Sequence, residues 1–240
     1  MPKSLAMITT SDASLLGVGL YTLPRAARLI GADVRAVRRW LLGYKRLYKG
    51  EERISPPLWK TELVDADLPE VAIGFRDLLE LRLVNAFAQH GVDLRVIRAT
   101  ANAAREMFSS PYPLTMKRFL TDGRRIFAEA VEMTGETSLI EPMHGQYIFS
   151  DIVKPSLYAG IEYDGGAALN WYPVPGRHTV VLDPQLQFGA PIVADVAIPT
   201  DTLYAAFQAE ERDRNVVAKI FDIDPRHVDA AVHFEERLAA

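Results

Sequence analysis

The chain has 240 residues, of which 49% are hydrophobic and 24% are charged. This balance is typical of a folded globular protein rather than a disordered one. The absence of cysteine excludes a disulfide scaffold, a thiolate zinc site and a cysteine nucleophile. The apolar stretch from Leu15 to Leu20 is too short for a signal-peptide core or a membrane span. We therefore expect a cytoplasmic protein with no membrane partner.

Charge is unevenly distributed along the chain. Residues 1–50 carry nine Lys and Arg against two Asp and Glu, a net charge of +7. Residues 51–119 have a net charge of −1, and residues 120–240 have a net charge of −10. This asymmetry favours a polyanion as the partner of the N-terminal part, with chance clustering on a solvated face as the alternative.

The first predicted element is a pair of short helices that follows a loose arm over residues 1–20. Thr22 is a good N-cap, and Gly31 can end the first helix with a positive φ. Asp33 then caps a second helix, which ends at Gly43. Two short helices joined by a tight turn that contains glycine are typical of a helix-turn-helix.

The second helix of this pair has a basic face. Helical spacing puts Val34, Val37 and Leu41 on one side, and three arginines on the opposite side. A helix fits the major groove of DNA, where arginine can bind guanine or phosphate, and Trp40 adds an aromatic edge. Basic residues after the helix are placed to contact the flanking DNA backbone. The predicted DNA-binding residues are Thr22, Arg35, Arg38, Arg39, Trp40, Lys45, Arg46 and Lys49.

Residues 44–72 break the helical periodicity and are consistent with a β-hairpin wing followed by a linker. Apolar residues at helical spacing then predict a helix over residues 75–89. Gly91 stops that helix, and Asp93 starts another, which extends to Phe108.

Short apolar runs separated by turn residues follow, and they predict a β-rich middle domain over residues 111–188. The runs cover residues 125–130, 146–149, 157–163, 167–172 and 179–182. Asp164 and Gly165 lie between two of these runs and indicate a hairpin. The helical period returns in the last part of the chain, with predicted helices over residues 203–210, 215–221 and 225–238.

The N-terminal part resembles MerR-type winged-helix regulators. The residues that carry the resemblance are Tyr21-Thr22, Ala26, Gly31, Val37, Arg39-Trp40, Phe75 to Leu79, Phe87, Gly91-Val92, Leu94 and Ile97-Arg98. The resemblance implies a DNA-binding domain over residues 21–110. The segment over residues 44–72 is longer than the usual wing of that family, so the wing contacts are not carried over.

The C-terminal part over residues 189–240 is similar to a small helical family of unknown function that is common in bacterial antitoxins. The matching residues are Gly189 to Val193, Ile198 to Thr200, Leu203, Val217-Ala218, Ile220-Phe221, Val228, Ala231 and Phe234-Glu235. Residues 195–197 replace the Gly-Thr-Arg of that family, so the role of its arginine is not carried over. The two resemblances together are similar to the larger VapB-type antitoxins of toxin–antitoxin pairs. They imply a repressor of its own operon that binds a toxin, typically a PIN-domain ribonuclease.

Apolar residues of the C-terminal helices are numerous enough for a three-helix core, and any surplus can form a face for a homodimer or the toxin. The candidate partner-binding residues are Leu203, Phe207, Val217, Phe221 and Phe234. Exposed charges of both signs in this part argue against DNA as its partner.

No motif in the sequence indicates catalysis. His227 and His233 are six residues apart, so they do not have the four-residue spacing that chelates a metal on a helix. His90, His144 and His178 are isolated. We therefore expect no catalytic residues, no metal and no cofactor. Two alternatives stay open: a stand-alone transcription regulator whose middle domain binds a small ligand, and an enzyme with an appended DNA-binding domain.

The sequence thus predicts an α+β protein with an N-terminal winged helix-turn-helix, a β-rich middle domain and a small C-terminal three-helix domain. Its expected partners are a double-stranded DNA operator, a toxin and a second copy of the chain.

Overall fold

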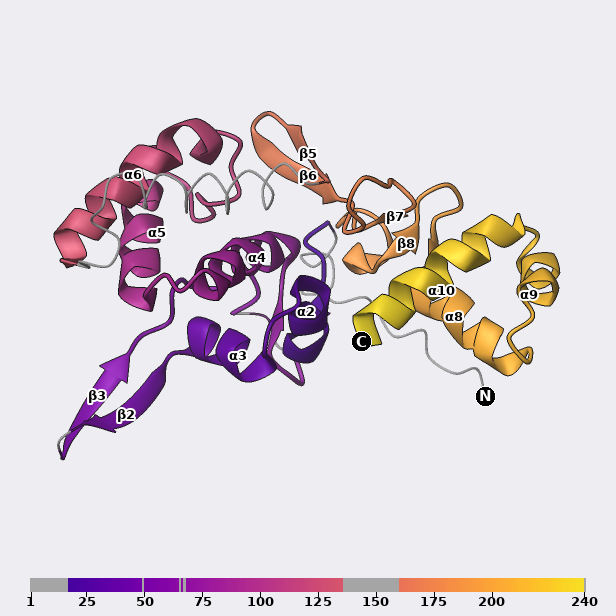
Figure 1. Ribbon diagram of the computed structural model, residues 1–240, viewed down its shortest axis with the longest axis horizontal. Helices are drawn as coiled ribbons and strands as arrows, with labels where there is room; N and C mark the ends of the chain where they lie inside the picture. Colours follow the sequence, from indigo (N-terminus) through magenta and orange to yellow (C-terminus); the bar gives the residue numbers. More distant parts are fainter. Residues whose placement is uncertain (1–16, 49, 65, 67, 136–159, 240) are drawn as a thin grey trace, which may run out of the picture.

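The computed structural model describes residues 17–48, 50–64, 66, 68–135 and 160–239. Helices α2 to α6 and small two-stranded sheets form the larger part of the molecule (Figure 1). Helices α8 to α10 form a lobe at the opposite end from the hairpin β2–β3. The protein therefore has the mixed α and β composition that the sequence predicts.

The chain starts with β1 (Tyr21–Thr22), α2 (Leu23–Ile30) and α3 (Val34–Leu42). The Thr22 hydroxyl accepts a hydrogen bond from the Arg25 amide at 3.4 Å, and Gly31 ends α2 with a φ of 65°. The Asp33 carboxylate accepts hydrogen bonds from two amides in the first turn of α3. The predicted helix boundaries and caps are confirmed.

A hairpin follows α3 and projects away from the rest of the molecule (Figure 1). Its strands are β2 (Tyr44–Tyr48) and β3 (Glu51–Ser55), which pair in antiparallel register. The chain then returns to the start of α2, where β4 (Ala72–Ile73) pairs with β1. The predicted hairpin within residues 44–72 is confirmed, and the rest of that segment reaches β4.

The central helix is α4 (Phe75–Gln89), against which α2, α5 (Leu94–Phe108) and α6 (Phe119–Thr134) are arranged. The predicted helices over residues 75–89 and 94–108 are confirmed. The central helix is buried on more than the one apolar face that its periodicity predicts. Its fully buried residues include two carboxylic acids, Asp77 and Glu80.

The prediction of a strand at residues 125–130 is wrong, because these residues lie in α6, a helix of 16 residues. Phe119, Ile126, Phe127 and Ala130 are buried, and their spacing fits one helix face when it is read over a longer window. The predicted hairpin around Asp164 is confirmed. Its strands are β5 (Ile161–Asp164) and β6 (Ala167–Trp171), and β7 (Val180–Val181) follows. The apolar run predicted at residues 146–149 lies outside the described residues.

The described residues of the predicted middle domain share a hydrophobic core with the N-terminal helices. Buried side chains from Tyr21 to Leu182 form one cluster, which also includes Phe234 of α10. Ring stacking of Phe87 on Phe127, with centroids 5.4 Å apart, joins α4 to α6 inside this cluster.

The C-terminal lobe has a second hydrophobic cluster. The lobe begins with the 3-10 turn η3 (Gln187–Gly189), which is followed by β8 (Ile192–Val193) and β9 (Ile198–Pro199). Strand β8 lies between β7 and β9 in a small antiparallel sheet. The helices α8 (Thr200–Ala209), α9 (Arg214–Phe221) and α10 (Pro225–Ala239) follow, so the three predicted C-terminal helices are confirmed. The buried residues of this cluster are Val193, Leu203, Val217, Ala218, Val228, Ala231 and Val232.

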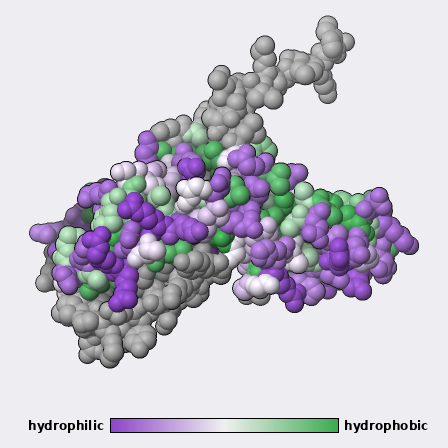
Figure 2. All heavy atoms as spheres, turned by 90° about the horizontal axis from the view of Figure 1, so that it is seen from above, coloured by the Kyte–Doolittle hydropathy of each residue, from purple (hydrophilic) through white to green (hydrophobic). Residues whose placement is uncertain are grey.

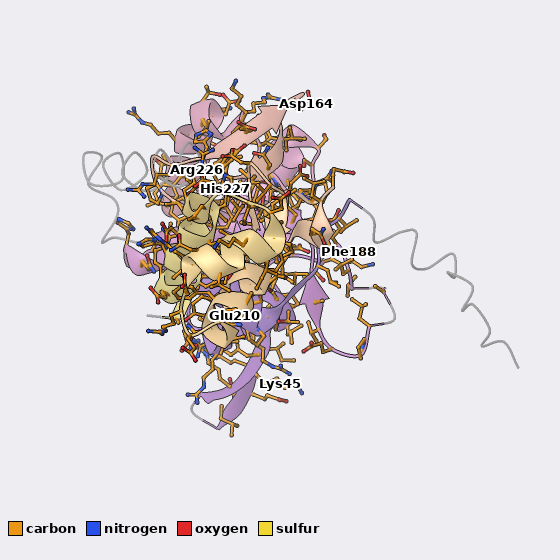
Figure 3. The ribbon with its side chains drawn as sticks, turned by 90° about the vertical axis from the view of Figure 1, so that its right-hand side faces the viewer. Lys45, Asp164, Phe188, Glu210, Arg226 and His227 are labelled. Atoms are coloured by element: carbon orange, nitrogen blue, oxygen red, sulfur yellow. The ribbon has the colours of Figure 1, made fainter. Side chains whose placement is uncertain are left out.

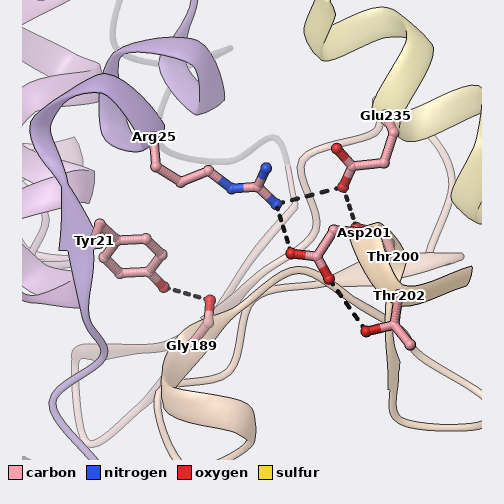
Figure 4. Close-up of polar contacts among 7 residues, drawn as sticks. All are labelled: Tyr21, Arg25, Gly189, Thr200, Asp201, Thr202 and Glu235. Carbon is pink, nitrogen blue, oxygen red and sulfur yellow. Dashed lines mark hydrogen bonds and ion pairs between the residues drawn. The ribbon is translucent and has the colours of Figure 1, made fainter. Parts of the chain in front are cut away.

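Polar contacts connect the C-terminal lobe to the start of α2 (Figure 4). The buried Tyr21 hydroxyl donates to the carbonyl of Gly189 at 2.7 Å. Arg25 contacts Glu235 of α10, which also accepts a hydrogen bond from the Thr200 hydroxyl. The lobe is thus attached directly to the helix that precedes α3.

Candidate nucleic-acid interface

Helix α3 presents three arginines to solvent. Arg35, Arg38 and Arg39 are all exposed, while Val37 and Leu41 on the opposite side are buried. This separation follows from the helical period, which places residues three and four apart on the same face. The basic face predicted for α3 therefore exists. Its first turn differs from the prediction, because Val34 is 41% exposed and does not line the core.

Trp40 does not belong to this basic face. Its side chain is only 8% exposed and packs in the large core cluster. Its carbonyl accepts a hydrogen bond from the Leu58 amide at 2.8 Å, which attaches the end of α3 to the chain after the hairpin. The prediction that Trp40 contacts DNA is wrong, because helical periodicity puts it nearer to Val37 and Leu41 than to Arg38.

Thr22 lies at the N-terminus of α2 and is half-buried. Its hydroxyl is occupied in capping that helix. The structure therefore shows that Thr22 caps α2. Its contact with DNA stays a prediction.

The hairpin β2–β3 continues the basic surface. Lys45 and Arg46 are exposed on β2, and the Lys45 ammonium lies 3.0 Å from the Glu52 carboxylate across the strand pair. Arg46 is directly opposite Arg53 in the register. The two strands thus place two arginine side chains at opposed positions of the hairpin.

Figure 3 shows Lys45 on the projecting hairpin, far from Arg226 and His227 of the C-terminal lobe. Lys49, which the sequence also predicts as a contact, lies outside the described residues.

Arg98 of α5 anchors the base of the hairpin, and sequence reasoning did not single it out for this role. Its guanidinium donates to the carbonyls of Pro57 at 2.7 Å and Pro56 at 2.8 Å. Burial lowers the pKa of this guanidinium. A cavity of about 310 Å³ lies between the hairpin base and α5, and Arg46 and Arg98 are among its lining residues. The contacts of Arg98 depend on a segment 41 residues away, so no local pattern identifies it.

Most of the predicted partner-binding residues belong to the interior. Leu203 and Val217 are fully buried in the C-terminal cluster, and Phe234 is buried in the large cluster. Phe207 and Phe221 are partly buried and pack against the C-terminal cluster. The prediction that Leu203, Val217 and Phe234 form a partner face is wrong, because Leu203 and Val217 pack inside the C-terminal cluster and Phe234 packs inside the large cluster.

Buried carboxyl groups hold the centre of the fold. Asp77 accepts hydrogen bonds from the Trp59 indole at 2.7 Å and from the amides of Glu62 and Gly74. Burial raises the pKa of Asp77 despite these bonds. Glu80 is fully buried, which raises its pKa to about 8, and it accepts a hydrogen bond from the Thr115 amide at 3.1 Å. These groups join α4 to the segments around it.

The histidines of the C-terminal lobe contact neighbouring groups within the lobe. His227 lies 3.3 Å from the Asp195 carboxylate, and His233 lies 2.7 Å from the Asp229 carbonyl. Within the described ranges, no three His, Asp or Glu side chains are grouped so that they could hold a metal ion. In the same part of the chain, no helix combines the length and apolarity needed to cross a membrane.

Comparisons with known proteins find a likeness in structure but none in sequence family. No protein-family model matches the chain, and no curated protein matches it. The crystal structure of Rv2018 from Mycobacterium tuberculosis is similar in fold, with a TM-score of 0.60 and 20% sequence identity. The similarity covers 90% of this chain and 99% of that chain. At this identity the likeness concerns the fold alone.

Proposed function

We propose that the protein is a DNA-binding antitoxin, which represses its own operon and neutralises a toxin. The observation that carries the proposal is the combination of three exposed arginines on α3 with the projecting basic hairpin β2–β3. In this proposal α2 and α3 act as a helix-turn-helix, and the hairpin acts as its wing.

The physical argument for DNA rests on shape and charge. An α-helix fits the major groove, and arginine side chains can donate two hydrogen bonds to guanine or bind phosphates. Arg35, Arg38 and Arg39 share one exposed face, so one docking geometry can use all three. Lys45 and Arg46 would contact the flanking backbone and contribute affinity without reading the sequence. A homodimer would place two such helices on paired half-sites.

The toxin half of the proposal is supported by the opposite charge of the rest of the chain. Residues 120–240 have a net charge of −10. An acidic surface complements the basic cleft with which a ribonuclease binds RNA, and complementary potentials favour selection of such a partner. The resemblance to VapB-type antitoxins points to a PIN-domain ribonuclease in the cytoplasm.

Two measurements test the proposal. The chain is co-expressed with the protein encoded beside it, purified through a salt wash and analysed by mass spectrometry. A bound protein of nuclease size, whose RNA cleavage stops on binding, is the expected result. Binding of the purified chain to its own promoter DNA is then measured at several salt concentrations, and we expect the affinity to fall steeply as salt rises. A chain that binds neither the adjacent gene product nor promoter DNA contradicts the proposal.

A second candidate function, a regulator that responds to a small ligand, is favoured by one cavity. This cavity of about 210 Å³ lies between the start of α4 and the hairpin β5–β6. Glu62, Arg76 and Asp164 are among the residues that line it, and burial raises the pKa of Glu62. This function predicts a chain that purifies without a protein partner, and whose affinity for DNA changes when a small molecule occupies the cavity.

A further inference from the structure

The cavity between the base of the hairpin β2–β3 and α5 is a candidate binding site for a small group. Hydrophilic side chains separate small groups of apolar ones on the face that Figure 2 shows, so the surface offers a ligand mainly charge and hydrogen bonds. The cavity has a volume of about 310 Å³. Small-ligand pockets have volumes of roughly 300–1,000 Å³, so this cavity can hold a group of several atoms.

The hairpin and α5 both contribute arginines to the walls of this cavity. Successive side chains of a strand point to opposite faces, and the register therefore places Arg46 and Arg53 on the same face of the hairpin. Both residues line the cavity. Arg95 and Arg98, in the first turns of α5, line it as well. Guanidinium groups from two separate elements thus surround one space.

Positive charge is in excess around the cavity. Four arginines line it, against one acidic lining residue, Asp93, which is itself paired with Arg95 at 3.1 Å. On the opposite face of the hairpin, Lys45 and Glu52 pair with each other. Glu51 lies near the tip of the hairpin and is exposed. Four arginines against Asp93 and Glu51 leave an excess of two positive charges.

Arg98 points most clearly to an anion as the ligand. Its guanidinium donates to the carbonyls of Pro56 and Pro57, and it approaches the Ser55 hydroxyl at 3.4 Å. These contacts use three of the five N–H donors of the guanidinium, and the acceptors carry no charge. In the part of the chain that the structure describes, neither Arg98 nor Arg46 has a carboxylate within 4.0 Å. Because partly buried cations are normally paired, an anion in the cavity would complete the surroundings of Arg98.

A phosphate group fits this arrangement better than a carboxylate does. Arginine binds phosphate through two parallel N–H donors, and the tetrahedral oxygens can accept from guanidinium groups on different sides. The two oxygens of a carboxylate lie in one plane, so they meet arginines from two walls less well.

We propose that the cavity between the hairpin base and α5 binds a phosphate group, which Arg46 contacts from the hairpin and Arg98 contacts from α5. A phosphate held in this way would fix the hairpin relative to α5. The group can belong to the DNA backbone or to a free phosphorylated compound, since the chemistry of recognition is the same. The site goes beyond the proposed function, and only its DNA source rests on that function.

Pyrophosphate is the probe for this site, and isothermal titration calorimetry with the full chain at low salt measures its binding. We expect one saturable site per chain. Arg46→Ala should raise the dissociation constant at least tenfold, because it removes a guanidinium from the hairpin wall. Arg95→Ala should also weaken binding, because Asp93 loses its paired arginine and then repels the anion.

A matched control separates this site from a general loss of positive charge. Arg177→Ala removes an exposed arginine that does not line the cavity, and this variant should bind pyrophosphate as the unmodified chain does. The circular dichroism spectra of all three variants should stay unchanged, because Arg46 and Arg95 are exposed as well.

Promoter DNA distinguishes the two sources of the phosphate. If the group belongs to the DNA backbone, pyrophosphate competes with DNA, and Arg95→Ala reduces the slope of log affinity against log salt by about 1. If the group belongs to a free compound, the DNA-bound chain binds pyrophosphate as tightly as the free chain does. In that case Arg95→Ala leaves DNA binding unchanged.

Two results would overturn the inference. One is pyrophosphate binding of equal affinity by the unmodified chain, Arg46→Ala and Arg95→Ala. The other is no pyrophosphate binding together with an unchanged salt dependence of DNA binding in Arg95→Ala. Both results leave the antitoxin proposal standing, since that proposal is tested by binding of the adjacent gene product and of promoter DNA to the unmodified chain.

Discussion

Arg25 of α2 and Glu235 of α10 are 210 residues apart in the chain, yet the Arg25 guanidinium lies 3.4 Å from the Glu235 carboxylate. The same carboxylate oxygen accepts a hydrogen bond from the Thr200 hydroxyl at 2.5 Å, and Asp201 lies 4.0 Å from Arg25 (Figure 4). The side chain of Glu235 is only 10% exposed, so solvent screens this pair weakly. One carboxylate thus joins three helices from the two ends of the protein.

Glu235→Gln keeps the shape of this side chain and removes its charge. We expect the free energy of unfolding to fall by about 1–3 kcal/mol, because the partly buried Arg25 loses its nearest anion. Urea denaturation measures the change. Glu236→Gln is the control, since Glu236 is exposed and its change should have little effect. In a double-mutant cycle with Arg25→Met, effects that simply add would show that the two residues do not interact.

Single alanine variants of Arg35, Arg38 and Arg39 test the basic face of α3. Each should weaken operator binding by about 1–3 kcal/mol without lowering the melting temperature, because these side chains are exposed. Fluorescence anisotropy with promoter DNA measures the affinity. Arg125→Ala on α6 removes a similarly exposed arginine and should leave DNA binding unchanged.

Trp40→Ala should instead destabilise the fold by about 3–5 kcal/mol, because it removes a large side chain from the core.

Unchanged operator binding in all three arginine variants would contradict the assignment of α3 as the recognition helix.

Gly43 and Gly31 form a matched pair for testing the position of the hairpin. Both have a positive φ, but a Cβ atom at Gly43 would lie 2.5 Å from the Ser55 carbonyl oxygen, while a Cβ atom at Gly31 would meet nothing within 4 Å. Gly43 also has a ψ of −179°, a conformation that is essentially restricted to glycine. Gly43→Ala should therefore displace the hairpin base and weaken DNA binding. Gly31→Ala should cost about 1 kcal/mol of stability and leave DNA binding unchanged. Equal DNA affinities of the two variants would show that the hairpin does not contribute.

Glu80 predicts a pH dependence of stability. Its pKa is raised from 4.5 to about 8 by burial, so between these values the folded protein holds a proton that the unfolded chain releases. The contribution of Glu80 to stability is therefore complete below about pH 4.5 and is lost as pH rises to 8. Glu80→Gln cannot ionise, so its stability relative to the unmodified protein should increase over this range. Urea denaturation between pH 5 and 8 measures this difference, and parallel pH profiles of the two proteins would contradict it.

Local signals predict much of the secondary structure. Thr22, Asp33 and Asp93 cap helices where the sequence predicts them, because a cap depends only on residues within one helical turn. The error at residues 125–130 has a local cause as well, since a short apolar run fits a strand and a buried helix equally well. The exposed arginines of α3 were predictable from local sequence as well, because the helical period places them on the opposite side from Val37 and Leu41.

The burial of individual side chains followed from contacts between distant segments. Trp40 and Phe234 are aromatic residues of a kind that often contacts a binding partner. Each packs in the core instead, because segments far away in the chain cover its side chain. Asp77 and Glu80 look like ordinary surface positions of an amphipathic helix until α5, α6 and the segment around Trp59 enclose α4. Their pKa values rise because of this enclosure, which periodicity does not report.

The amino-acid sequence alone determined the two hairpins, the division of charge and the described helices other than α6, because these depend on neighbouring residues and on composition. Only the tertiary structure decided which apolar residues of the C-terminal lobe remain available to a partner. Leu203 and Val217 face the core while Val216 and Ile220 face solvent, although all four are apolar residues of predicted helices. The physical reason is that burial depends on which helix faces pack together.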